Sequence, residues 1–339
     1  MKRELIMRRR KFLALIGAGT AAAVWPHSAH AQQPQTKIRR VGLIASGAPA
    51  SLGPKGNVTA FRRRLAELGY ELGTNLIIEG RWHEGRMERL PQLAGELVAL
   101  HSDVIVAAGP EAALLAVLSK AGSSIPIVMA AIDYDPLAGG YIKQLNRPGG
   151  NVTGVFLRQV EATAKRLELL KETLPTLKRV AVLWDAFTTQ TSDQMRAAET
   201  TAQRLGVMVK PFEIRGDELS ALSSARERGM EAALVLMSPA FFFRKVALTE
   251  ALNQDKLPAS FGVREFVEDG GLMSYGANLN DVYVRLADYV DRILKGANPA
   301  ETPVEQPTKF ELVLNQKAAE NLGVSIPPSL LVRADDVIE

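Results

Sequence analysis

Hydrophobic and polar positions follow two periods along the chain, and the two periods alternate. A short apolar run at 40–45 is typical of a strand that is covered on both faces, and 103–107 and 126–131 are also predicted to be strands. Between them, stretches such as 55–68 and 87–100 repeat apolar residues every three to four positions, as in amphipathic helices. Strands that alternate with helices predict parallel sheets with right-handed crossovers. The pattern therefore predicts an α/β fold.

The alternation is interrupted once. The segment from Asn146 to Gly154 holds three glycines and a proline, which indicates a break between two units. In the first unit we also expect a strand at 75–81 and a helix at 110–121. In the second unit we expect helices at 162–173, 191–205, 220–229, 240–254 and 279–294, and strands at 179–184, 207–213, 232–237, 258–261 and 310–314. The sequence thus predicts two consecutive α/β units of similar size.

The N-terminal segment has a pattern of its own. Three arginines and a lysine at 8–11 precede an apolar run from 12 to about 25, and an Ala-x-Ala motif ends at Ala31. These features are typical of a secretory signal peptide, and the run is shorter than the ~20 residues that span a bilayer. The paired arginines resemble a twin-arginine signal, although the general secretory route stays open. We expect a signal peptide at 1–31, cleavage near Ala31 and a periplasmic mature chain.

The charge of the chain depends on that cleavage. The 339 residues carry 41 Lys and Arg against 37 Asp and Glu, a formal net charge of +4. Residues 1–31 contain six of the basic residues and one of the acids, which leaves 35 basic and 36 acidic residues. The basicity thus belongs to the export signal, and no nucleic-acid partner is expected. The absence of cysteine excludes disulfides and cysteine nucleophiles.

Common catalytic motifs are missing from the sequence. No phosphate-binding loop, dinucleotide-binding glycine pattern or G-x-S-x-G elbow occurs. Beyond the predicted signal peptide the histidines are His83, after a predicted strand, and His101, at the end of a predicted helix. We expect both to be surface or capping residues. Neither a metal nor a cofactor is therefore predicted, while carboxylate chemistry stays possible.

Candidate ligand-binding residues lie just after the predicted strands. In open α/β sheets, ligands bind outside the carboxyl ends of the strands, where helix N-termini supply N–H groups that suit a carboxylate. Asp side chains suit an ammonium group, and Trp or Tyr suits a flat side chain. Such loops suit an amino-acid-like zwitterion. The candidates are Ser46, Gly47, Gly109, Pro110, Glu111, Asp133, Asp135, Trp184, Asp185, Ser238 and Tyr275.

Purely structural interpretations of these residues also stay open. The three aspartates can cap turns or helices, and Trp184 can be a core residue. Ser238, before a proline, is typical of an ordinary helix start. The three phenylalanines at 241–243 are expected to pack between helix and sheet, with one ring able to reach a cleft.

Several segments, taken together and in order, resemble one family. They are IPIV at 125–128, DP at 135–136, RPGGNVTG at 147–154, LLK at 169–171, REFV at 264–267, GGLMSYG at 270–276, PVEQPTKF at 303–310 and IPPSLL at 326–331. The mature chain resembles the ABC-transporter substrate-binding proteins, which include tryptophan- and aromatic-amino-acid-type receptors with the type I periplasmic-binding-protein fold. At 108–111 this chain has Ala-Gly-Pro-Glu where relatives usually carry a Ser- or Thr-containing turn.

The resemblance implies two Rossmann-like lobes with parallel sheets, joined by a multi-crossover hinge. The implied first lobe comprises 38–155 and about 276–300, and the second comprises 156–275 and about 301–339. It also implies a monomeric receptor, not an enzyme, that captures a small polar solute (amino-acid-like or carboxylate) by hinge closure. The implied partners are an ABC permease in the inner membrane and its ATPase.

Two other functions stay open. An exported enzyme would use carboxylates in the cleft, and Asp133, Asp135 and Asp185 are the obvious set. A ligand sensor that signals to a membrane kinase would use the same fold.

Overall fold

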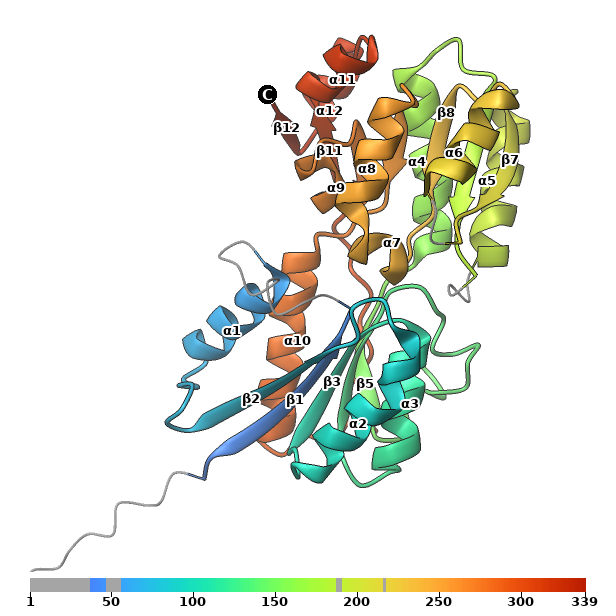
Figure 1. Ribbon diagram of the computed structural model, residues 1–339. Helices are drawn as coiled ribbons and strands as arrows, with labels where there is room; N and C mark the ends of the chain where they lie inside the picture. Colours follow the sequence, from blue (N-terminus) through green and yellow to red (C-terminus); the bar gives the residue numbers. More distant parts are fainter. Residues whose placement is uncertain (1–36, 47–55, 187–190, 216–217) are drawn as a thin grey trace, which may run out of the picture. The chain divides into compact units, whose positions relative to one another are not determined.

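Two β-sheets form the framework of the computed structural model (Figure 1). The structure describes residues 37–46, 56–186, 191–215 and 218–339, so the predicted signal peptide and Gly47 lie outside it. In the described chain, the first sheet has five parallel strands in the order β2-β1-β3-β4-β5. The second has seven, in the order β12-β11-β10-β9-β8-β6-β7, with β10 and β11 antiparallel and the other neighbours parallel. The predicted α/β class with two parallel-dominated sheets is confirmed.

Helices cover both faces of the first sheet. Its strands are β1 (Arg39–Ala45), β2 (Leu76–Trp82), β3 (Val104–Gly109), β4 (Ile127–Ala131) and β5 (Val152–Phe156). On one face lie α1 (Asn57–Glu67) and α10 (Leu279–Leu294), and on the other α2 (Leu90–Ala99) and α3 (Glu111–Ala121) (Figure 1). The 3₁₀ helix η2 (Met87–Arg89) directly precedes α2. Neighbouring residues of β3 enter opposite cores, Val106 with α1 and α10 and Ile105 with α2 and α3. Burial on both faces explains the continuous apolar runs of the sequence.

The second sheet is covered in the same way. Its strands are β6 (Arg179–Trp184), β7 (Met208–Glu213), β8 (Ala232–Val235), β9 (Ala259–Phe261), β10 (Met273–Gly276), β11 (Glu311–Asn315) and β12 (Asp336–Ile338). Its helices are α4 (Gln159–Thr173), α5 (Thr191–Leu205), α6 (Glu218–Glu227), α7 (Pro239–Phe243), α8 (Lys245–Gln254), α9 (Glu265–Glu268), α11 (Gln316–Leu322) and α12 (Pro328–Arg333). One core contains side chains of α4, α5 and α12, and another contains those of α6, α8 and α9. We call the first sheet with its helices the first lobe, and the second sheet with its helices the second lobe.

The chain crosses between the lobes three times. The crossings are residues 157–158 before α4, residues 277–278 before α10 and residues 306–310 before β11. The segment 302–305, which the sequence assigns with the second lobe, hydrogen-bonds to the first sheet. The Thr153 hydroxyl donates to the Thr302 carbonyl (2.7 Å), and the Glu305 N–H donates to the Gly154 carbonyl (3.0 Å). The third crossing therefore starts after Glu305.

Strand β5 lies inside the segment whose glycines indicated a break. Gly154 has φ +135°, and a Cβ there would lie 2.1 Å from the Met129 carbonyl oxygen of β4. Only glycine permits so close an approach between neighbouring strands. The interpretation of residues 146–154 as a break between units was therefore wrong for the last three of them, which belong to β5. The chain stays in the first sheet until Phe156.

Two further elements differ from expectation. Strand β10 lies in the glycine-rich segment 270–276, where a Cβ on Gly276 would lie 1.8 Å from the Gly262 carbonyl oxygen. The expected helix at 240–254 is two helices, because Arg244 adopts φ −104° and ψ 19°, outside the helical region. In both places the local backbone geometry overrides the sequence pattern.

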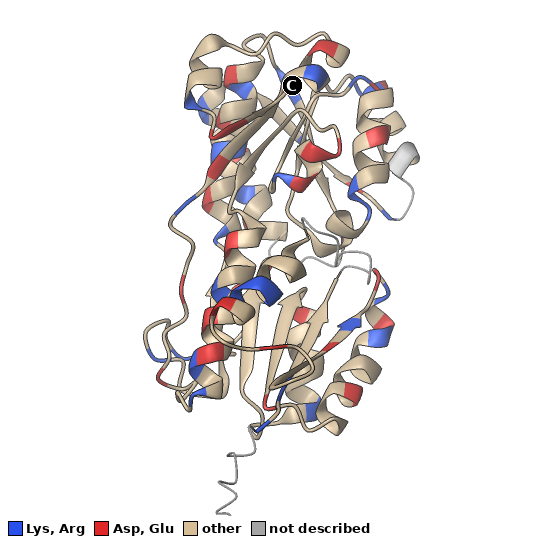
Figure 2. Ribbon diagram, turned by 90° about the vertical axis from the view of Figure 1, so that its left-hand side faces the viewer, with Lys and Arg blue, Asp and Glu red and all other residues tan. Residues whose placement is uncertain are grey.

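Charged side chains of both signs are interspersed over both lobes (Figure 2). Several join separate elements: Arg64 of α1 pairs with Asp288 of α10 (2.8 Å), and Arg285 of α10 pairs with Glu305 (2.5 Å). Among the described residues, we find no helix with the length and apolar character needed to cross a bilayer.

Replacing Gly154 by alanine tests the origin of β5. We expect Gly154→Ala to lower the free energy of unfolding by at least about 3 kcal/mol, because the new Cβ meets the β4 backbone at an unfavourable φ. Urea unfolding followed by circular dichroism measures the loss. Gly150→Ala is the matched control, since a Cβ there meets nothing within 4 Å. A loss below about 1 kcal/mol for Gly154→Ala would contradict this account.

Candidate ligand-binding site

A cavity of about 40 Å³ lies at the carboxyl ends of strands from both lobes. The first lobe contributes residues that end or follow β1, β3 and β4 and the first residue of α1, and the second lobe contributes residues around α7. Two residues of α10 complete the lining. The lining residues are Ser46, Asn57, Ala108, Gly109, Ile132, Met237, Pro239, Phe242, Leu279 and Tyr283. The cavity is thus mostly apolar, with two aromatic rings and a few polar groups, as in sites for small organic ligands.

Ser46 and Gly109 form one polar corner of this cavity. Ser46 is 8% exposed, and its hydroxyl has no hydrogen-bond partner. A Cβ on Gly109 would lie 2.7 Å from that hydroxyl oxygen, and Gly109 has φ +145°. Glycine at 109 therefore makes room for the serine hydroxyl, which faces the cavity as a donor and acceptor for a ligand.

Asp133 and Asp185 are two buried acidic residues at the carboxyl ends of the strands. Asp133 follows the cavity residue Ile132, Asp185 follows β6 of the second lobe, and each is 1% exposed. Burial raises the pKa of Asp133 well above its usual range, and the nearby charges of Asp185 and Glu111 raise it further. The two acids thus come from different lobes and lie near enough for their charges to interact, and a cation beside Asp133 would favour its ionised form.

Further buried polar groups surround this edge. His83 directly follows β2 and its N–H donates to the Ala45 carbonyl (3.3 Å), yet the imidazole is fully buried and neither ring nitrogen has a partner. The Tyr134 hydroxyl is likewise buried and unpartnered. The expectation that His83 is a surface or capping residue was wrong, because the ring is fully buried at the end of β2, next to the end of β1. His101, in contrast, is exposed at the end of α2.

The structure brings only some of the predicted site residues together. Ser46 and Gly109 line the cavity, Pro110 and Glu111 follow Gly109, and Ser238 lies between the lining residues Met237 and Pro239. Pro110 is the N-cap of α3. The Glu111 carboxylate accepts a hydrogen bond from the Tyr141 hydroxyl (2.7 Å). Ser238 caps α7, accepting from the N–H of Ala240 (3.1 Å) and of Phe241 (3.4 Å).

The other predicted residues lie in different surroundings. Asp135 caps a turn by accepting from the N–H groups of Leu137 (2.8 Å) and Ala138 (3.2 Å). Trp184 is half-buried against the core between the second sheet and α4. Tyr275 stacks on Phe310 at 5.8 Å, and this pair joins β10 to the third crossing. Gly47 lies outside the described residues.

Comparison with known proteins identifies the family. Residues 55–338 match the family model of the ABC transporter substrate binding proteins. The chain belongs to this family. The resemblance inferred from the ordered segments is confirmed.

Individual proteins and solved structures are also similar to this chain. A tyrosine-binding protein of Clostridioides difficile (strain R20291) is 24% identical over 266 residues, 78% of this chain and 75% of that protein. An ABC domain from Streptococcus pneumoniae, solved in complex with L-Trp, has a TM-score of 0.80 and 27% identity. A conserved domain protein from Vibrio cholerae O1 biovar El Tor strain N16961 has a TM-score of 0.80 and 28% identity. Both structures cover 89% of this chain and 100% of their own, and they share the two-lobed type I periplasmic-binding-protein fold.

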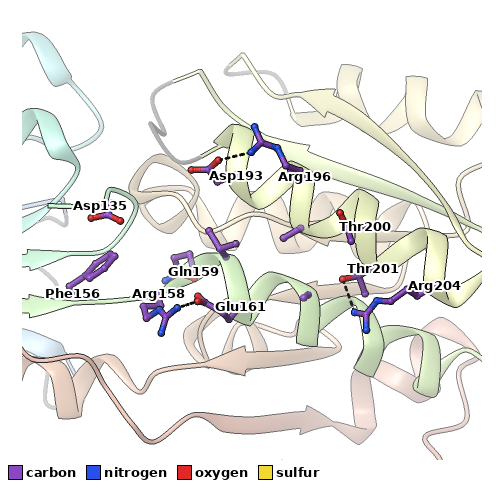
Figure 3. Close-up of a pocket in the computed structure, with 13 residues that line it drawn as sticks. Asp135, Phe156, Arg158, Gln159, Glu161, Asp193, Arg196, Thr200, Thr201 and Arg204 are labelled. Carbon is purple, nitrogen blue, oxygen red and sulfur yellow. Dashed lines mark hydrogen bonds and ion pairs between the residues drawn. The ribbon is translucent and has the colours of Figure 1, made fainter. Parts of the chain in front are cut away.

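A wider hollow of about 600 Å³ lies between α4 and α5 (Figure 3). Its charges neutralise one another: Arg158 pairs with Glu161, and Arg196 lies 3.8 Å from Asp193. These side chains are more than half exposed, so the hollow is a solvated surface of this substrate binding protein. Asp135 lies at its rim and not in the interlobe cavity.

A second polar hollow of about 360 Å³ lies between α1 and α9. Glu265, the first residue of α9, lines it with one buried carboxylate oxygen that has no partner. The pKa of Glu265 is raised to about 7, mainly by burial and also by the charges of Glu268 and Glu311, while Lys245 acts to lower it. In the described chain, no group of three or more His, Asp or Glu residues is placed to hold a metal ion.

Sequence reasoning missed the residues that tertiary packing selects. Phe242 is the ring of the phenylalanine triplet that reaches the cavity, whereas Phe241 is buried in the core and Phe243 is 41% exposed. Met237 and Tyr283 gave no signal, since apolar residues on a strand end or a helix normally predict core. His83 follows a strand at the carboxyl edge, and the same rule that selected Asp133 would have selected it.

The buried imidazole of His83 predicts a pH dependence of stability. Burial, together with the nearby charge of Arg89, lowers the pKa of His83 to about 4. The unfolded chain therefore takes up a proton first, near pH 6.5, so the contribution of His83 to stability is complete above that pH and falls toward pH 4. We expect the wild type to lose about 3 kcal/mol relative to His83→Phe across this range. Urea unfolding of both proteins between pH 4 and 8 measures the difference, and parallel pH profiles would contradict it.

Proposed function

We propose that this protein is the exported receptor of an ABC importer and that it binds a free amino acid with an aromatic side chain. Family membership supports the transporter role, and the relatives described as binding tyrosine and L-Trp support the solute class. The observation that carries the proposal is the pair Asp133 and Asp185. These two buried carboxylates come from different lobes and lie close enough for Asp185 to raise the pKa of Asp133.

The ammonium group of the solute binds between these two acids. Two carboxylates at a buried site repel each other, and an ammonium group between them relieves the repulsion while donating charge-assisted hydrogen bonds to both. Because one acid belongs to each lobe, the same interaction favours lobe closure. Binding and hinge motion are thereby coupled.

The side chain of the solute lies against Phe242 and Tyr283. Both rings line the interlobe cavity, one from α7 and one from α10. Aromatic rings pack favourably in offset or edge-to-face arrangements. The present cavity of about 40 Å³ is close to the ~30 Å³ share of one water molecule, so the lobes separate to admit the solute.

The three crossings act as the hinge. We place the lobe limits at these crossings, so the first lobe comprises 38–156 and 279–305, and the second comprises 159–276 and 311–339. The Arg285–Glu305 pair (2.5 Å) and the Tyr275–Phe310 stack (5.8 Å) brace the chain beside them. A hinge of short, braced segments lets each lobe move as a rigid body.

The mature receptor acts in the periplasm as a monomer. The pattern at 1–31 supports export and cleavage near Ala31. The closed form then presents its solute to an inner-membrane permease and its ATPase. No catalytic role or cofactor is needed for this cycle.

The aspartate pair supplies the test of solute class. Isothermal calorimetry with L-tyrosine, L-tryptophan and L-phenylalanine, and with aliphatic L-amino acids, should show tight binding of an aromatic member. We expect Asp185→Asn to weaken that binding about 10–100-fold, the loss of a charged hydrogen bond. Binding of 3-(4-hydroxyphenyl)propionate, which lacks the amino group, should be weak and unchanged by the substitution.

Asp135→Asn is the matched control for this experiment. It makes the same chemical change two residues from Asp133, but Asp135 only caps a turn, which asparagine also does. Binding should stay within twofold of wild type. Equal effects of both substitutions, or no binding of any aromatic amino acid, would contradict the proposal.

An exported enzyme is the second candidate, because the raised pKa of Asp133 beside Asp185 would also suit acid–base catalysis. Incubation of the bound solute with the protein distinguishes the two. Recovery of unchanged solute supports the receptor, whereas turnover that is lost in Asp185→Asn with binding retained supports the enzyme.

A further inference from the structure

A fully buried arginine lies beneath the second-lobe side of the cavity. Arg166 of α4 has no exposed surface. Its guanidinium donates to neutral oxygens, which are the Ala162 carbonyl (3.2 Å), the Val235 carbonyl (3.2 Å), the Gln159 side-chain oxygen (3.3 Å) and the Thr163 hydroxyl (2.8 Å). These contacts hold the planar group in one orientation.

Among the residues that the structure describes, the Arg166 side chain has no acidic counter-ion. Across residues 37–46, 56–186, 191–215 and 218–339, no Asp or Glu forms an ion pair with it. Burial lowers the pKa of Arg166 to about 10, so the group remains a cation at neutral pH. Buried charges are normally paired, because an isolated charge loses several kcal/mol of solvation. An anion nearby would therefore be bound favourably.

The position of Arg166 connects it to the cavity. Val235, which accepts from Nη1, is the last residue of β8, so the guanidinium lies at the carboxyl edge of the second sheet. A Cβ on Gly262 would lie 3.0 Å from Nη1 and 2.9 Å from the sulfur of Met237. Met237 lines the interlobe cavity. The cation is thus separated from the ligand space by a glycine and one flexible side chain.

One N–H group of the guanidinium is available to a ligand. Arginine has five N–H donors, two of them on Nη1. Nη1 donates to the Val235 carbonyl, and the described residues offer it no second acceptor. This nitrogen is the one that faces Gly262, where the absence of a side chain leaves only the flexible Met237 side chain between the guanidinium and the cavity.

We propose that Arg166 determines specificity for a carboxylate group on the bound solute. The inference rests on the proposed receptor function and completes it. The acids Asp133 and Asp185 attract the ammonium end of the solute, and Arg166 attracts its carboxylate end from the second lobe. A solute whose carboxylate is replaced by an amide leaves the buried cation uncompensated.

Two ligand pairs and three proteins test this inference. The pairs are L-tyrosine with L-tyrosinamide, and 3-phenylpropionate with 3-phenylpropionamide. The proteins are wild type, Arg166→Met and Thr163→Val. Thr163→Val is the matched control, because Thr163 is buried in the same hydrogen-bond network but carries no charge. Circular dichroism and urea unfolding check that each variant is folded. Where Arg166→Met does not fold, Arg166→Gln replaces it as the uncharged variant and is read by the same criteria.

The readout is the ratio of the amide and carboxylate dissociation constants. We expect wild type and Thr163→Val to prefer the carboxylate on the order of 100-fold, and Arg166→Met to retain less than a tenth of that preference. Arg166→Lys keeps the positive charge and should therefore keep most of the preference for the carboxylate. A merely structural role would weaken both members of each pair equally.

Three results would overturn the inference: an unchanged ratio in Arg166→Met, an equal fall in Thr163→Val, or no preference in wild type. The second ligand pair separates this inference from the proposed function. Discrimination within the phenylpropionate pair without tyrosine binding would refute the amino-acid function and support the role of Arg166. Tight tyrosine binding with an unchanged amide-to-carboxylate ratio in Arg166→Met would support the amino-acid function and refute the role of Arg166.

Discussion

Burial of α10 against the first sheet is the interaction on which the rest of the structure depends. Only two residues separate the helix from β10 of the second sheet, yet its apolar face lies in the core with α1 and the strands of the first sheet. Each large apolar side chain buried there contributes about 1.5–3 kcal/mol. Because the helix cannot leave that core without losing this contribution, the end of β10 is held beside the first lobe, and the chain must return through 306–310 to form β11.

That constraint decides where a ligand binds. With the strand ends of the two lobes tied to α10, side chains after β1, β4, β6 and β8 converge on one region. Ser46, His83 and Tyr134 keep buried polar atoms without partners there, at a cost to folding stability that a purely structural core would avoid. Such conflicts between local satisfaction and global fold are expected at functional sites.

The sequence predicts most of this architecture and only part of the site. Short apolar segments predicted β1, β3 and β4. Strands β5 and β10 were missed because they contain Gly154 and Gly276, and the close backbone approaches that require these glycines exist only in the folded structure. Asp133 and Asp185 follow from the rule that ligands bind at the carboxyl ends of strands. Arg166 follows from no local pattern, since a basic residue in an amphipathic helix predicts a solvated face until the packing of α4 on β8 is known.

The two charged ends of the proposed site are distributed unequally between the lobes. Arg166 and Asp185 belong to the second lobe, and the first lobe contributes Asp133. On this proposal the second lobe alone holds both ends of a zwitterion, and the contact with Asp133 forms only as the lobes close. Only an interaction that differs between open and closed states shifts their populations. The energy of closure would then come from Asp133, because burial raises the pKa of this carboxyl and a cation between the lobes would favour its ionised form.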